Sequence, residues 1–110
     1  MTDRELISAP DRFDAASRIV VTDSGCSVVR GAGDDSCVEK SIAASDVESV
    51  RVVPTDEAAI LIVESRRSVH EFLPDDPHRW PFYIQIPLSP EDAREVRDRV
   101  EARLLARPRR

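Results

Sequence analysis

Histidine and acidic side chains cluster between positions 70 and 78, where they form the sharpest polar cluster in the sequence. His70 and Glu71 are followed by Asp75, Asp76 and His78. Imidazole nitrogens and carboxylate oxygens bind divalent metals, and a loop beside a strand can bring the second histidine back toward the first. The spacing matches no established ligand motif. The cluster supports a metal-binding or small-molecule-binding site as the alternative hypothesis, while the main expectation is a protein with no cofactor.

Ordinary strand and turn chemistry accounts for the same residues. If Phe72 faces the core, the alternation of a strand places His70 on the core face, where a hydrogen bond would satisfy it. If the neighbouring positions face the core instead, His70 is exposed to solvent. Asp75 and Asp76 lie between two prolines, where they would cap a turn. The sequence leaves these roles open.

An aromatic cluster follows the second histidine. Trp80 is the only tryptophan, and it lies in a proline-rich loop with Arg79 before it and Phe82 and Tyr83 shortly after. An exposed tryptophan on such a loop is a natural anchor for a protein partner. Alternatively, Trp80 folds over an open end of the sheets and covers the core. The anchor hypothesis makes these four residues the predicted partner-binding site.

The two cysteines, Cys26 and Cys37, allow two interpretations. They meet across a hairpin if its turn is tight and centred on Gly31 and Ala32, and the geometry then permits a disulfide or a redox switch. A shift of one residue in the strand register separates them. They are then ordinary thiols in a reducing cell, which is what we expect.

Motifs for hydrolysis and for phosphate binding are missing from the sequence. No Gly-x-Ser-x-Gly elbow occurs, and neither histidine has a predictable serine partner. The two glycines at 31 and 33 are followed by aspartates instead of a third glycine or a Gly-Lys-Ser/Thr sequence, so phosphate would be repelled there. We therefore expect no enzymatic activity.

Length and charge indicate one acidic domain. The chain has 110 residues, of which 41% are hydrophobic and only 5% aromatic, so aliphatic side chains must form the core. Of the 16 basic residues, Arg107, Arg109 and Arg110 belong to a basic C-terminal tail at 107–110. The rest of the chain has 13 basic and 21 acidic residues and a net charge of −8. It therefore repels nucleic acids and anionic membrane surfaces.

The sequence also bears on cellular location. It contains no run of about 18 apolar residues that could span a bilayer. The first residues lack the basic and apolar regions of an export signal. We expect a cytoplasmic protein without a transmembrane segment.

Short apolar runs separated by turn residues predict a mainly β domain over residues 18–106. Residues 1–17 mix charges with Pro10 and show no sustained period, so we expect a partly ordered lead-in in which Phe13 anchors a short turn. The unbroken apolar run at 60–63 should form the most buried strand. Strands are predicted at residues 18–22, 26–30, 37–42, 47–53, 58–64, 68–73 and 82–88, with a polar turn at 65–67 before the sixth.

A C-terminal helix is predicted after the last strand. Ser89 suits the N-cap position and Pro90 the first helical position. Apolar residues then recur at spacings of three and four, which indicates a helix with one buried face. This stripe consists of Ala93, Val96, Val100 and Leu104. The preceding strand should turn Phe82, Ile84, Ile86 and Leu88 toward the same core.

Two stretches of the sequence resemble the small prokaryotic pleckstrin-homology-like (PH-like) domains. Residues 19–25 followed by 28–31 are similar to the opening hairpin of these domains, and residues 41–42 with 45–50 are similar to the segment that comes next. Seven strands followed by one amphipathic helix is also the element order of that fold. The resemblance implies a partly open barrel of about seven antiparallel strands over residues 18–106, closed by the C-terminal α-helix.

The resemblance also implies a class of function. PH-like domains are generally binding modules, although fold alone does not determine function. Eukaryotic phosphoinositide readers carry several lysines and arginines around the first hairpin, whereas the turn here, residues 23–25, carries one negative charge, so phosphoinositide binding is not expected. We expect a small, soluble, non-catalytic module that binds a protein partner or forms a homo-oligomer through a sheet edge or the Trp80 loop.

Overall fold

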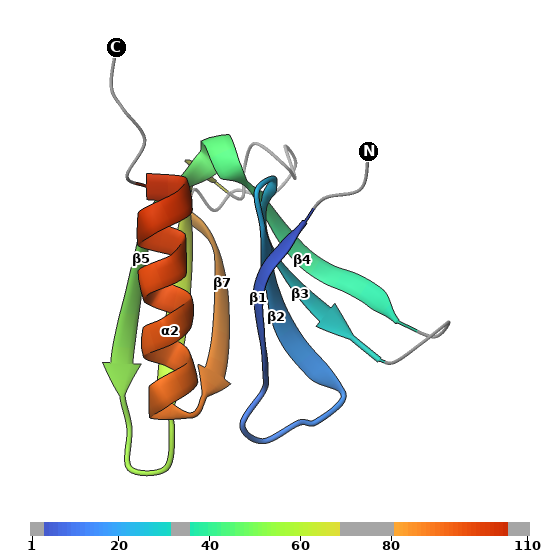
Figure 1. Ribbon diagram of the computed structural model, residues 1–110, viewed down its shortest axis with the longest axis vertical. Coiled ribbons are helices and arrows are strands. Elements are labelled where there is room, and N and C mark those ends of the chain that lie inside the picture. The colour runs from blue at the N-terminus through green and yellow to red at the C-terminus, as the bar shows by residue number, and fades with distance from the viewer. Residues whose placement is uncertain (1–3, 32–35, 69–80, 106–110) are drawn as a thin grey trace.

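The computed structural model describes residues 4–31, 36–68 and 81–105, which form two antiparallel sheets and a C-terminal helix (Figure 1). The four-stranded sheet has the order β1-β2-β3-β4, with β1 at Glu5–Pro10, β2 at Ser17–Thr22, β3 at Gly25–Arg30 and β4 at Cys37–Ala43. A 3₁₀ turn, η2 (Ala44–Asp46), leads into the second sheet. That sheet has the order β5-β6-β7, with β5 at Val47–Pro54, β6 at Ala59–Ser68 and β7 at Pro81–Leu88. The predicted mainly β class is confirmed, as two separate sheets.

Strand β1 was not predicted. Residues 5–10, expected to belong to a partly ordered lead-in, pair with β2 from Glu5 opposite Thr22 to Pro10 opposite Arg18. The pairing places Ala9 in the core. A register shift after Glu5 interrupts the alternation, and Pro10 ends the strand, so too few regular positions remain for a period to be visible in the sequence. The lead-in interpretation was therefore wrong for residues 5–10.

The predicted polar turn at 65–67 is also wrong, because β6 continues through these residues to Ser68. The ladder between β6 and β7 is irregular from Glu64 to Ser68, and the Oγ atom of Ser65 accepts a hydrogen bond from the main-chain N–H of Arg67 (3.0 Å). Polar residues here mark an irregular stretch of strand instead of a turn. The remainder of the predicted sixth strand, residues 69–73, lies outside the described residues.

The core lies between the sheets and is aliphatic, as the composition predicts. In β7, Ile84, Ile86 and Leu88 are buried, which confirms the predicted inward face. In β6, the apolar run at 60–63 is buried on one face only. Leu61 and Val63 are fully covered, whereas residues 60 and 62 are half-buried on the outer face. The run was predicted to form the most buried strand, and its inner face is fully covered while its outer face is partly exposed, as is common in antiparallel sheets.

Helix α2 (Pro90–Val100) connects the two sheets. Its contacts include β1 of the first sheet and all three strands of the second, and Figure 1 shows it lying over the three-stranded sheet, roughly along the strands. The helix begins as predicted, because the Oγ atom of Ser89 accepts a hydrogen bond from the N–H of Asp92 (3.2 Å). A π-helical turn, η3 (Glu101–Leu105), continues it. The predicted apolar stripe is buried at Ala93, Val96, Val100 and Leu104.

Replacing the N-cap tests this account of the helix. We expect Ser89→Ala to lower the free energy of unfolding by about 1 kcal/mol, because the N–H of Asp92 loses its acceptor. Ser89→Asp keeps an acceptor and should stay within a few tenths of a kcal/mol of the wild type. Urea denaturation followed by circular dichroism measures both. Equal losses for the two variants would contradict the capping role.

Candidate functional site

A hollow of about 150 Å³ lies where β4 approaches β7, and we call it the corner hollow. Its lining comes from the turn before β2 and from strands β2, β3, β4 and β7. Charged and other polar side chains dominate it, with two apolar residues, so the hollow suits a small polar ligand better than an apolar one. The lining residues are Asp11, Ser17, Val28, Arg30, Glu39, Lys40, Gln85 and Ile86.

A β-bulge in β4 places two consecutive charged residues in the corner hollow. Val28 of β3 pairs with Lys40, but Val29 pairs with Val38, so Glu39 is an extra residue on β4. In a regular strand, neighbouring side chains point to opposite faces. The bulge changes this direction, and Glu39 and Lys40 both line the hollow.

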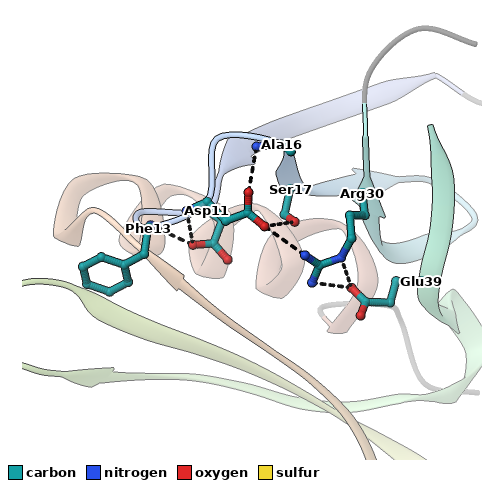
Figure 2. Close-up of polar contacts among 7 residues, drawn as sticks. Asp11, Phe13, Ala16, Ser17, Arg30 and Glu39 are labelled. Atoms are coloured by element: carbon teal, nitrogen blue, oxygen red, sulfur yellow. Dashed lines mark hydrogen bonds and ion pairs between the residues drawn. The ribbon is translucent and has the colours of Figure 1, made fainter. Parts of the chain in front are cut away.

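Arg30 joins two acidic residues at the corner hollow (Figure 2). Its Nη1 donates to Oδ2 of Asp14 (2.9 Å), and its Nη2 and Nε donate to Oε2 of Glu39 (3.1 and 3.2 Å). These hydrogen bonds and charges, led by the hydrogen bond with Glu39, raise the pKa of Arg30. All three side chains remain substantially exposed, so the network orients them more than it stabilises the fold.

The turn at 11–17 is held by its own side chains. Asp14 accepts hydrogen bonds from Ser17 Oγ (2.9 Å) and from the N–H of Ala16 (3.1 Å), and these bonds, together with Arg30, lower its pKa. Oδ1 of Asp11 accepts from the N–H groups of Phe13 (2.8 Å) and Asp14 (3.1 Å). Such local bonds are why aspartates favour turns.

The turn at 11–17 is anchored by Arg12. Phe13, predicted as the anchor, is 64% exposed. The main-chain N–H of Arg12 donates to the carbonyl oxygen of Pro87 (2.8 Å), and its Nε donates to that of Glu57 (3.2 Å). Arg12 therefore joins the turn to β7 and to the β5–β6 connection.

Lys40 reaches across the corner from β4 to β7. Its Nζ donates to the carbonyl oxygen of Tyr83 (3.4 Å) and lies 5.8 and 5.5 Å from the ring centres of Phe82 and Tyr83. At these distances, the ammonium group is attracted to both rings. Within the ranges that the structure covers, Lys40 has no carboxylate partner. It is a cation held in place by aromatic and main-chain groups.

The structure locates half of the predicted partner-binding site. Phe82 packs partly against the core, whereas Tyr83 is 41% exposed on the opposite face of β7. Arg79 and Trp80 lie outside the described residues. The sequence interpretation missed Lys40 and Gln85, which lie close to Tyr83. One sequence signal was present, because Lys40 is the only lysine in the chain.

The structure does not cover the alternative metal site predicted from the sequence. The four residues of the alternative metal site, His70, Asp75, Asp76 and His78, lie outside the described residues. Across 4–31, 36–68 and 81–105, no cluster of histidine, cysteine and acidic residues is arranged to hold a metal.

The strand register separates the two cysteines. Cys26 pairs with Ile42, whereas Cys37 pairs with Arg30 at the other end of the hairpin, and both thiols are free. A close approach requires Cys26 opposite Cys37, and this register is not the one that β3 and β4 form. Burial raises the pKa of Cys26 to about 12, whereas Cys37 is exposed.

The comparisons identify no relative. No family model, curated protein or solved structure matches this chain. No helix in the described part of the chain is long and apolar enough to cross a membrane.

Thiol labelling tests the environments of the cysteines. At pH 8, we expect an aromatic disulfide reagent to label one thiol in the folded protein and two in urea. Cys26 is buried and stays protonated, whereas Cys37 is exposed. The variant Cys37→Ser should show no labelling until it unfolds. Rapid labelling of this folded variant would show that Cys26 is accessible.

The pH dependence of stability tests the bonds to Asp14. Its pKa lies below the usual 3.8, so the ionised carboxylate stabilises the folded state. This contribution is complete above the unfolded-state pKa and is lost as the pH falls through the lower, native pKa. We expect the stability difference between the wild type and Asp14→Asn to be constant above about pH 5 and to shrink below about pH 4. Urea titrations at a series of pH values measure it, and a difference that grows on acidification would refute the assignment.

Proposed function

We propose that this chain is a non-catalytic PH-like module that binds a protein partner. The described residues form seven strands followed by a C-terminal helix, which is the element order that the resemblance implies, although β1 precedes residue 18, where the resemblance begins. Modules of this kind are generally binding proteins. The partly open barrel belongs to this proposal. Support for the function comes from the surface of the three-stranded sheet.

The outer face of the three-stranded sheet carries the proposal. The pairing of the strands places Val53, Ile60 and Pro87 side by side, one on each of the three strands. Ile62 lies on the same face, two residues further along β6. Val53 is 40% exposed, and the other three are half-buried. The solvent face of an antiparallel sheet is normally polar. An apolar row there is typical of a surface that another protein covers.

The charges beside this row indicate the chemistry of the partner. Arg51 pairs with Glu64 (3.3 Å) and Arg66 with Glu48 (3.8 Å), so the neighbouring strand positions are largely neutralised. The chain has a net charge of −5, which disfavours nucleic acids and phosphoinositides. The partner that fits is a protein presenting apolar side chains. Tyr83 adds an aromatic contact, and Arg79 and Trp80, directly before β7, remain predicted contacts.

Substitution of the exposed apolar residues tests the proposal. We expect Val53→Ser with Tyr83→Ser to lose a protein that the wild type captures from its source cell, because both removed side chains lie on the outer face. Val38→Ser is the matched control, since Val38 is 61% exposed but belongs to the other sheet. Capture that survives the double substitution, or that fails with the control, contradicts the proposal. Light scattering of the purified chain identifies a second copy as the partner if the wild type alone is dimeric.

A further inference from the structure

The edge of β7 offers one residue for main-chain pairing. The carbonyl groups of Tyr83 and Pro87 both point away from β6, because they accept hydrogen bonds from Lys40 and Arg12. Main-chain groups alternate in direction along an antiparallel strand, so the N–H and C=O of Gln85 face the same way. Gln85 also lines the corner hollow. Outside the β6–β7 ladder, the described residues provide no hydrogen-bond partner for either group.

Both ends of this edge are closed. At one end, the ammonium group of Lys40 donates a hydrogen bond to the carbonyl oxygen of Tyr83. At the other end, the main-chain N–H of Arg12 donates to the carbonyl oxygen of Pro87, and Pro87 itself has no main-chain N–H. A longer strand would have to compete with Lys40 and Arg12 for these carbonyl groups. A ligand that leaves both contacts in place is one residue long.

The two ends carry opposite charges. Lys40 lies at the Tyr83 end, and Asp11, which precedes Arg12 in the chain, lies at the Pro87 end. Arg30 is paired with both Glu39 and Asp14, and its charge also acts on Asp11 at longer range. Among the described lining residues, Lys40 and Asp11 are the charged groups that form no ion pair. Oδ1 of Asp11 is used by the turn, which leaves Oδ2 as an acceptor.

We propose that the corner hollow binds a free α-amino acid, paired in an antiparallel direction with Gln85. The antiparallel direction places the ammonium group toward Asp11 and the carboxylate toward Lys40. The ligand nitrogen donates to the carbonyl of Gln85, and the ligand carboxylate accepts from the N–H of Gln85. This function goes beyond the docking of a protein on the outer face and does not depend on it.

The size of the hollow favours a small ligand. A volume of about 150 Å³ corresponds to roughly five water molecules at about 30 Å³ each, so amino acids with short side chains fit best. The terminus of a peptide carries only one of the two charges. A free amino acid satisfies both ends at once, and charge-assisted hydrogen bonds are the strong ones.

Nuclear magnetic resonance titration tests the proposal with the full chain at pH 7. We expect glycine or alanine to shift the main-chain amide signal of Gln85 in a saturable manner. N-acetylalanine, which lacks the ammonium group, and alaninamide, which lacks the carboxylate, should each bind about tenfold more weakly or worse, because each loses a charge-assisted hydrogen bond. These two ligands need no protein variant, so the result does not depend on the folding of a mutant.

Two protein variants test which residues bind the carboxylate and the ammonium group of the ligand. Lys40→Gln and Asp11→Asn should each weaken alanine binding by about tenfold or more, and Asp11→Asn keeps a side-chain oxygen for the turn. Arg66→Gln, remote from the hollow, is the control and should bind like the wild type. Val53→Ser should also bind alanine normally, which separates this site from protein docking. The proposal is overturned if no amino acid gives saturable shifts at Gln85, or if acetate and N-acetylalanine bind as tightly as alanine.

Discussion

The burial of one apolar stripe of α2 is the interaction on which the rest of the structure depends. Ala93, Val96 and Val100 are completely covered, and the helix contacts β1 as well as the three-stranded sheet. With few aromatic residues in the chain, this aliphatic contact and the two inner sheet faces must supply most of the hydrophobic stabilisation. By packing against both sheets, the helix holds them in one relative orientation. The lining residues of the corner hollow, which come from both sheets, therefore keep their positions relative to one another.

Much of the fold follows from local patterns, whereas the irregular strands do not. Alternation predicts β7 and its inward face, and the N-cap serine with its apolar stripe predicts α2. The prediction fails for β1 and for the end of β6, where register shifts interrupt the alternation. A periodic pattern detects only uninterrupted strands, so each interruption hides part of an element.

The candidate site was harder to predict than the fold, because register determines it. Arg30, Glu39, Lys40 and Gln85 come from three strands, and a one-residue bulge decides which of them share a face. Nothing in the sequence specifies that bulge. The cysteines show the same difficulty, since the actual β3–β4 register places them at opposite ends of the hairpin. Only the aromatic pair at 82–83, adjacent in sequence, was found in advance.

The contacts of Arg12 and Lys40 with β7 have a consequence for the behaviour of concentrated protein. Exposed strand edges are templates on which chains polymerise, and proteins suppress this with proline, lysine and covering loops. The β7 edge has all three features in Pro87, Lys40 and the turn at Arg12. An apolar outer sheet face can therefore stay exposed while this edge is protected against amyloid-like growth.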